Sequence, residues 1–220
     1  MEKSQIAVLI PVYNECKTIK KIIIEVNKIA TAVVIDDGSN DGSDLIVKKE
    51  AKLYMLNKKN KGYDYSLNLG FNYVKKKFKF LITFDADGQH KIKDLKKVIY
   101  YLKKGYDIVC CERKKLQRFS EIIFSFWFRL FFNSKDPLCG LKGYSILRFK
   151  KKRKFSKFKT FGTEFLIFAI CRNLRIKFLE IKTNKRKDNS RFGNFIYSNF
   201  LILKSLVIII IKKNKILNEI

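Results

Sequence analysis

The chain has 220 residues, which fits one domain with a short appendage, and 47% of them are hydrophobic, too many for an intrinsically disordered protein. Its 48 Lys and Arg against 20 Asp and Glu give a formal net charge of +28, which fits a nucleic acid, an anionic membrane or an anionic substrate. An AT-rich genome also enriches Lys, Ile, Asn and Phe, so the charge alone identifies no partner. Five cysteines without a CxxC pair argue against a zinc site or a disulfide framework and indicate a reduced, cytosolic chain.

The first half of the chain alternates short apolar runs with amphipathic segments. The apolar runs predict strands at Ile6–Ile10, Ala32–Ile35, Leu53–Leu56, Phe80–Phe84 and Ile108–Cys111. The amphipathic segments predict helices at Ile19–Ile29, Asp44–Ala51, Tyr65–Val74 and Leu95–Leu102. Strands that alternate with helices indicate an α/β fold with a mostly parallel sheet and helices on both faces.

The second half is more aromatic and more basic. Phe119–Phe132 predicts a helix, either in the core or at a membrane interface. It is followed by a predicted Gly-containing loop at Asp136–Gly143, a helix at Glu164–Arg172 and a strand at Ile176–Ile181.

The last apolar run, Phe195–Ile211, is about as short as a bilayer-spanning helix can be. Lys204 in its middle makes spanning more costly, and lysines follow it at once. We therefore expect a helix that lies on an anionic membrane surface, with a helix packed on the core as the alternative.

Three polar segments follow predicted strands: Pro11–Glu15, Asp36–Gly42 and Asp85–His90. In a parallel sheet ligands bind beyond the carboxyl ends of the strands, so these segments predict a binding site at one sheet edge.

The Asp85-Ala86-Asp87 sequence predicts a metal site. Two carboxylates at positions i and i+2 of one loop can both face a cation, and oxygen ligands suit Mg²⁺ or Mn²⁺. Gln89 adds a neutral oxygen and His90 is a further neighbour. An ordinary surface loop is the alternative interpretation of such a motif.

The Asp36–Gly42 segment fits a turn that ends in a helix N-cap at Asp41 or Ser43. A turn does not explain why Asp36 ends an apolar strand directly beside Asp37. A carboxylate there can accept a hydrogen bond from a base N–H or a ribose hydroxyl.

Together these segments resemble the signature motifs of family 2 glycosyltransferases, which have the GT-A fold. The resemblance covers roughly residues 5–113 and includes Asn60–Tyr63 and Leu67–Gly70, with Asp64 as a departure. Further along, Asp136–Tyr144 resembles the D-x-x-x-G-[FL]-[RK] block of the dolichol-phosphate and polyprenyl-phosphate sugar synthases, and Phe161–Glu164 and the stretch 186–193 also resemble that branch.

The resemblance implies an inverting transferase that moves a sugar from a nucleoside-diphosphate sugar to a polyprenyl phosphate, at the cytoplasmic face of a membrane. It also implies a GT-A domain over residues 1–193, with a donor half at 1–113 and an acceptor half at 114–193, and an apolar helix at 194–220. One alternative acceptor is a glycan hydroxyl in cell-envelope polysaccharide synthesis. A non-enzymatic alternative is a basic membrane- or nucleic-acid-binding module on a decayed scaffold, but the acidic cluster would repel nucleic-acid phosphates, so no nucleic-acid partner is expected.

The resemblance also assigns roles to residues. Those expected at the nucleotide are Pro11, Tyr13, Glu15, Asp36, Asp37, Asp85 and Ala86. Those expected at the metal are Asp85, Asp87 and Gln89. Arg113 is expected to add positive charge at the diphosphate. Asp136 or Glu164 would be the general base for a hydroxyl acceptor, or else a helix cap or a partner of the surrounding Lys and Arg. The candidates for an acceptor phosphate are Arg129, Lys142, Arg186 and Arg191.

Overall fold

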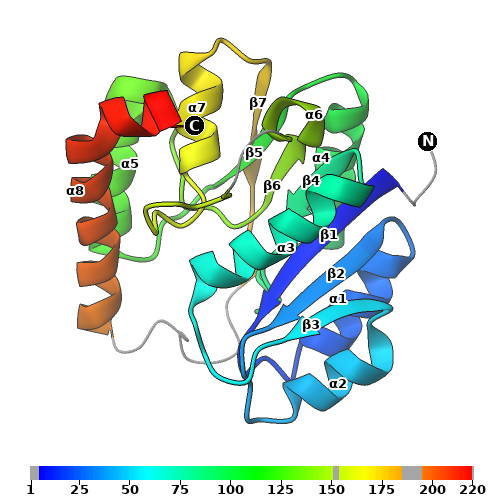
Figure 1. Cartoon of the computed structure of the whole chain (residues 1–220). Helices are drawn as coiled ribbons and strands as arrows, with labels where there is room; N and C mark the ends of the chain where they lie inside the picture. The colour runs from blue at the N-terminus through cyan, green and yellow to red at the C-terminus, as the bar shows by residue number, and fades with distance from the viewer. Residues whose placement is uncertain (1–4, 151–153, 185–194, 220) are drawn as a thin grey trace.

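The computed structural model describes residues 5–150, 154–184 and 195–219. A seven-stranded sheet lies between two layers of helices (Figure 1). The strands are β1 (Ile6–Val12), β2 (Thr31–Asp36), β3 (Leu53–Leu56), β4 (Phe80–Thr83), β5 (Ile108–Arg113), β6 (Lys142–Ser145) and β7 (Ile176–Ile181). The helices are α1 (Ile19–Asn27), α2 (Ser43–Glu50), α3 (Tyr63–Lys77), α4 (Ile92–Lys103), α5 (Phe119–Phe132), α6 (Ile146–Phe149), α7 (Glu164–Cys171) and α8 (Phe195–Glu219).

The sheet has the strand order β3-β2-β1-β4-β6-β5-β7. The pairs β1–β2, β1–β4, β2–β3 and β5–β7 are parallel, and β6 runs antiparallel to both β4 and β5. The carboxyl ends of β1, β2 and β4 therefore lie at one edge of the sheet. The prediction of an α/β fold with a mostly parallel sheet is confirmed.

The predicted loop at Asp136–Gly143 was wrong at its end, because Lys142 and Gly143 belong to β6. The sequence Lys-Gly-Tyr-Ser has no apolar run, so strand periodicity could not identify it. Its burial comes from neighbours distant in sequence, since Tyr144 packs edge-on against Phe165.

Alternate residues of β1 enter different cores. Val8 and Ile10 pack in the cluster formed with α1 and α4, whereas Ala7 and Leu9 pack in the cluster formed with α3. Burial on both faces explains why the parallel strands are continuous apolar runs.

A third apolar cluster joins α5, α7 and α8. In this cluster Phe124 and Phe128 of α5 pack together with Ile202 and Ile209 of α8. The predicted helix at the end of the chain is confirmed and continues beyond Ile211. None of the helices in the described ranges is long and apolar enough to cross a membrane. The predicted domain boundary at residue 193 lies outside the described residues.

Candidate active site

The loops after β1, β2 and β4 meet at the carboxyl edge of the sheet. The backbone N–H of Asn14, after β1, donates a hydrogen bond to Ser39 Oγ, after β2, at 2.9 Å. The Thr18 hydroxyl donates to the carbonyl of Ala86, after β4, at 2.5 Å. The structure thus brings together the three polar segments that the sequence placed at strand ends.

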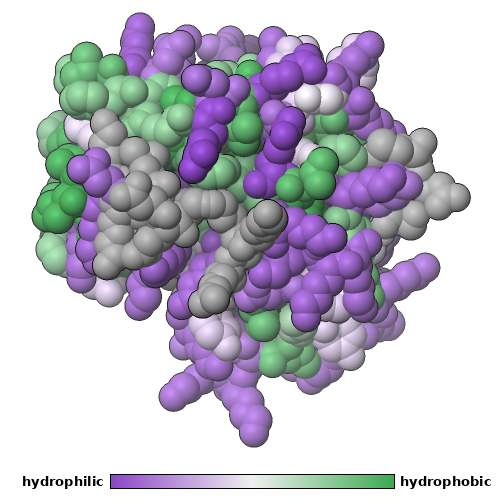
Figure 2. All heavy atoms as spheres, turned by 45° about the horizontal axis from the view of Figure 1, so that its top comes forward, coloured by the Kyte–Doolittle hydropathy of each residue, from purple (hydrophilic) through white to green (hydrophobic). Residues whose placement is uncertain are grey.

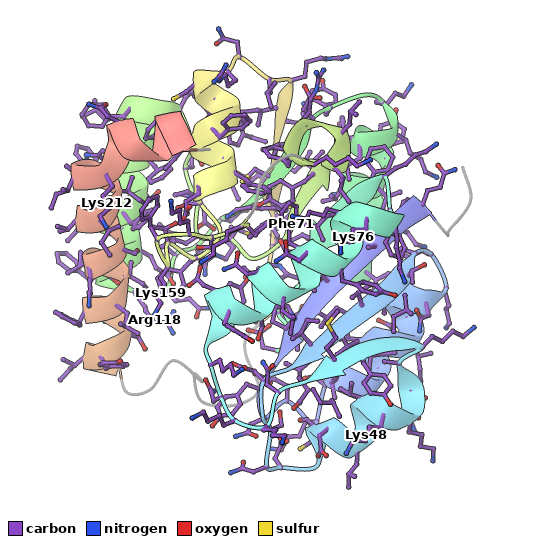
Figure 3. All side chains as sticks on the ribbon, viewed as in Figure 1. Lys48, Phe71, Lys76, Arg118, Lys159 and Lys212 are labelled. Carbon is purple, nitrogen blue, oxygen red and sulfur yellow. The ribbon has the colours of Figure 1, made fainter. Side chains whose placement is uncertain are left out.

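Asp36 ends β2 with one carboxylate oxygen hydrogen-bonded and the other without a described partner. Its Oδ1 accepts the backbone N–H groups of Gly38 at 3.1 Å and Ser39 at 3.0 Å. Its Oδ2 is buried and has no hydrogen-bond partner within the described residues. Beside Asp36 lies an open cavity of about 230 Å³, and the other residues that line it are Gly38, Ser39, Asp44, Lys48, Leu56, Asn57 and Lys58. Lys48 approaches it from α2, in the lower part of Figure 3.

Asp37 is buried and its oxygens are occupied by the chain itself. They accept the Asn57 side-chain amide at 2.7 Å and the backbone N–H groups of Lys61 at 3.0 Å and Gly62 at 2.7 Å. Asp37 therefore orders the loop that leads into α3.

The remaining residues expected at the nucleotide lie at the same edge. Pro11 and Tyr13 are half-buried, and Glu15 is buried. The backbone N–H of Glu15 donates to Ser43 Oγ at 2.9 Å, which ties the β1 loop to the start of α2.

Asp85 follows β4 and is held by two side chains. The Tyr63 hydroxyl lies 3.3 Å from its Oδ1, and His90 Nε2 lies 3.2 Å from its Oδ2. Although burial opposes ionisation, the hydrogen bond and charge of His90 and the nearby charge of Arg113 lower the pKa of Asp85. Burial, together with the Asp85 charge, raises the pKa of Tyr63 well above its usual value, so Tyr63 is a neutral hydrogen-bond donor.

Asp87 and Gln89 complete the loop after β4. Asp87 Oδ1 accepts the backbone N–H of Gln89 at 3.0 Å, and the Gln89 carbonyl accepts the backbone N–H of Asn184 at 2.9 Å. In the part of the chain that the structure describes, no group of three His, Cys, Asp or Glu side chains is arranged to hold a metal ion. The ionised Asp85 with Asp87 fits a divalent cation whose other ligands are phosphate oxygens and water.

Arg113 lies at the end of β5 in a buried charge cluster. Its Nε is 2.7 Å and its Nη2 3.0 Å from the two carboxylate oxygens of Asp136, and Nη2 is 3.4 Å from Glu121. Although burial opposes it, the charge of Asp136 raises the pKa of the Arg113 guanidinium. Arg113 and Asp136, predicted separately as a phosphate cation and a base, are thus partners of one another.

Glu164 begins α7 and orders the loop before it. Its carboxylate accepts the backbone N–H groups of Lys157 and Phe158, both at 2.9 Å, and the hydroxyls of Ser156 and Thr160 at 3.2 and 2.9 Å. With its oxygens so engaged and 1% of its surface exposed, Glu164 has no solvent-facing oxygen for proton transfer.

Of the four residues expected at an acceptor phosphate, the structure describes two, and these two lie in different surroundings. Lys142 is buried in β6 and donates to the carbonyl of Pro137 at 2.5 Å, and Arg129 is exposed on α5. Arg186 and Arg191 lie outside the described residues.

Sequence reasoning gave no role to two residues that contact Asp85. Tyr63 was noted only as part of a motif and His90 only as a neighbour, yet both reach the carboxylate, Tyr63 from the start of α3 and His90 from the loop that contains Asp85. The only sequence signal for a role of Tyr63 was its position directly after Gly62 in the motif. Its contact with Asp85 could not be predicted, because only the fold brings α3 close to the end of β4.

Comparison with known proteins identifies relatives of this arrangement. The family model described as glycosyl transferase family 2 matches residues 7–175. An uncharacterised protein of Methanocaldococcus jannaschii is 31% identical over 203 residues, which are 83% of this chain and 83% of that protein. The undecaprenyl-phosphate 4-deoxy-4-formamido-L-arabinose transferase of Edwardsiella ictaluri is 29% identical over 125 residues, which are 51% of this chain and 38% of that enzyme.

Two solved structures have a similar fold at low sequence identity. Mannosyl-3-phosphoglycerate synthase from Rubrobacter xylanophilus superposes with a TM-score of 0.76 at 14% identity, and the match covers 96% of this chain and 75% of the synthase chain. Glucosyl-3-phosphoglycerate synthase from Mycobacterium tuberculosis, in complex with Mn²⁺ and UDP-glucose, has a TM-score of 0.72 at 15% identity, and the match covers 93% of this chain and 78% of that synthase chain.

Proposed function

Because the chain belongs to glycosyl transferase family 2 and has the GT-A fold, we propose that it transfers a sugar from a nucleoside-diphosphate sugar to a polyprenyl phosphate at a membrane surface. The observation that carries the proposal is the arrangement at the sheet edge: a cavity beside an unpartnered carboxylate oxygen of Asp36, with Asp85 and Asp87 on the neighbouring loop.

The Asp36 cavity suits the nucleoside of the donor. The free Oδ2 can accept one base N–H, and Lys48, Lys58 and Asn57 surround the remaining space with polar groups. The solved relative that contains UDP-glucose with Mn²⁺ supports a nucleotide-sugar donor and a divalent cation.

Asp85 and Asp87 would hold a Mg²⁺ or Mn²⁺ ion together with the diphosphate. When bound, the cation would neutralise the diphosphate leaving group as a Lewis acid. Tyr63 and His90 fix the Asp85 carboxylate by hydrogen bonds, so its geometry is set before the donor arrives.

The buried carboxylates favour an acceptor that is already an anion. Asp136 is paired with Arg113, and Glu164 binds its own loop, so neither offers a free base to a hydroxyl. A phosphate oxygen needs no base: it attacks the sugar C1 from the face opposite the diphosphate, and the C1–O bond to the diphosphate breaks with inversion. The undecaprenyl-phosphate relative supports this acceptor class.

The direct test is a panel of UDP- and GDP-sugars with detergent-solubilised polyprenyl phosphate, in which release of nucleoside diphosphate is measured. We expect release that depends on Mg²⁺ or Mn²⁺, is abolished by chelator and falls by at least about 100-fold in Asp87→Asn, while Glu25→Gln on α1 has no effect. Release with 3-phosphoglycerate or a glycan hydroxyl, and none with polyprenyl phosphate, would replace the proposed acceptor.

A further inference from the structure

The outward sides of α5 and α8 are apolar. Ten large hydrophobic side chains on them are between 52% and 78% exposed: Phe119, Ile122, Phe126, Leu130 and Phe131 from α5, and Ile196, Tyr197, Phe200, Val207 and Ile211 from α8. We call these residues the α5–α8 face. A surface helix normally turns polar residues outward, and here both helices bury one apolar side and expose another. Exposed patches of this kind mark contact surfaces.

The two apolar sides belong to one region of the surface. α5 and α8 lie side by side along the left of the molecule in Figure 1 and share the cluster that contains Phe124 and Ile202. The Asn199 side chain accepts the backbone N–H of Ser120 at 3.1 Å, which aligns the two amino-terminal ends. In the space-filling view the hydrophobic residues gather over these helices, whereas most of the remaining visible surface is hydrophilic (Figure 2).

The exposed charges that the structure describes on these helices are all positive. Among the described side chains of α5 and α8, those that are both charged and exposed are Arg129, Lys204 and Lys212. The acidic Glu121 is buried and bonded to Arg118 at 3.0 Å, so it does not offset them. Apolar side chains interspersed with cations suit the headgroup region of a membrane that contains anionic lipid.

We propose that the α5–α8 face docks on an anionic lipid bilayer, with both helices lying in the interface. A second copy of the chain fits less well, because a two-fold contact through this face would enclose Arg129 and Lys204 of both copies with no described, exposed acidic side chain of α5 or α8 to pair with them. The inference rests on the proposed function at one point: a polyprenyl-phosphate acceptor gives the protein a reason to bind a bilayer.

The start of α5 also lies beside the end of β5. The Glu121 carboxylate, in the first turn of α5, lies 3.4 Å from Nη2 of Arg113, the last residue of β5. The face therefore begins where β5 ends, at the carboxyl edge of the sheet. Docking would hold that edge near the headgroup of a lipid-linked acceptor.

Flotation of the full chain with vesicles of phosphatidylcholine, with and without about one third phosphatidylglycerol, tests the apolar part. The double variant Phe126→Ser/Phe200→Ser should lose at least about tenfold in binding, because both side chains would enter the interface. The matched control Leu45→Ser/Leu147→Ser removes two equally exposed leucines, from α2 and α6, and should bind like the wild type.

The electrostatic part is tested with Arg129→Gln/Lys204→Gln. Each cation near anionic lipid contributes about fivefold in binding, so this variant should bind about 25-fold less tightly at low salt, and the difference should shrink as salt rises. The control Lys76→Gln/Lys103→Gln removes the same charge from α3 and α4, and Lys76 lies well away from α5 and α8 (Figure 3).

Three results would overturn the proposal: a wild type that does not bind anionic vesicles at low salt, controls that lose as much binding as the face variants, or a solution dimer that Phe126→Ser dissociates. Nucleoside-diphosphate release with a short-chain, water-soluble prenyl phosphate separates this failure from failure of the proposed function. We expect Phe126→Ser/Phe200→Ser, which removes no residue expected at the acceptor phosphate, to keep that release. If the protein binds vesicles but releases no nucleoside diphosphate with any prenyl phosphate, the docking proposal would be supported and the proposed acceptor class would be refuted.

Discussion

Gly140 lies directly against Asp85. A Cβ on residue 140 would be 1.9 Å from Asp85 Oδ2, much closer than any non-bonded contact. The Gly140 backbone is also fixed to β4, because its carbonyl accepts the Thr83 hydroxyl at 2.7 Å. The glycine in the segment before β6 is therefore needed for the Asp85 carboxylate to occupy its position.

We predict that Gly140→Ala displaces the Asp85 carboxylate from Tyr63 and His90. Because Asp85 is expected to share a cation with the diphosphate, the metal concentration for half-maximal turnover should rise at least about tenfold. Manganese titrations of nucleoside-diphosphate release measure this, and far-UV circular dichroism checks the fold. Unchanged metal dependence in a folded variant would show that Asp85 is not a metal ligand.

The Arg113–Asp136 ion pair predicts a large effect on stability. Asp136→Asn removes the closer of the two carboxylates beside the buried guanidinium and leaves Glu121, at 3.4 Å, to balance its charge; breaking such a pair should lower the free energy of unfolding by about 3 kcal/mol. Urea unfolding measures the loss. Glu180→Gln, which breaks the exposed pair with Lys114, is the matched control and should leave the urea midpoint nearly unchanged. An equal effect of the two variants would contradict this account of the cluster.

Asp64 predicts a specific pH dependence of stability. Burial raises its pKa to about 6; the Ser156 hydrogen bond opposes the shift and the Glu164 charge adds to it. The folded protein then binds more protons than the unfolded chain between about pH 4 and pH 6, so stability falls as pH rises through that window. Asp64→Asn should remove this slope and exceed the wild type in stability by up to about 3 kcal/mol at pH 7. Chemical unfolding at pH 4.5 and pH 7 tests it, and a constant difference between the two pH values would contradict it.

The sequence predicted elements well where periodicity alone decides them. The apolar runs of β1, β2 and β5 and the amphipathic pattern of α4 correspond closely to the structure. It did not predict β6, because the register of a short Lys-Gly-Tyr-Ser strand depends on β4 and β5 on either side of it.

The site was predictable to the same extent. Asp36 and Asp85 were identified because carboxylates at strand ends are unusual, and the parallel topology brings their loops together. The partners of the charged side chains were not predictable, since the pairing of Arg113 with Asp136 joins residues separated by 23 positions through the fold.

Asp36 provides the sharpest test of donor binding, because its two oxygens have different surroundings. Oδ1 accepts the N–H groups of Gly38 and Ser39, whereas Oδ2 is buried without a described partner, and Asp36 is one of the residues that line the cavity. In Asp36→Asn the amide oxygen can keep the first set of bonds while the NH₂ group replaces Oδ2, so the loop should hold while an acceptor becomes a donor. We expect binding of the preferred nucleoside diphosphate, measured by calorimetry with Mn²⁺ and without any acceptor, to weaken at least about tenfold, since two donors would then face one another.

Asp44→Asn, at the same cavity, is the control for loss of one negative charge and should weaken binding less. If the Asp36→Asn variant binds the nucleoside diphosphate as tightly as the wild type, Asp36 does not hydrogen-bond to the nucleotide base. If neither uridine nor guanosine diphosphate binds the wild type at millimolar concentration, the catalytic interpretation fails in favour of a decayed scaffold.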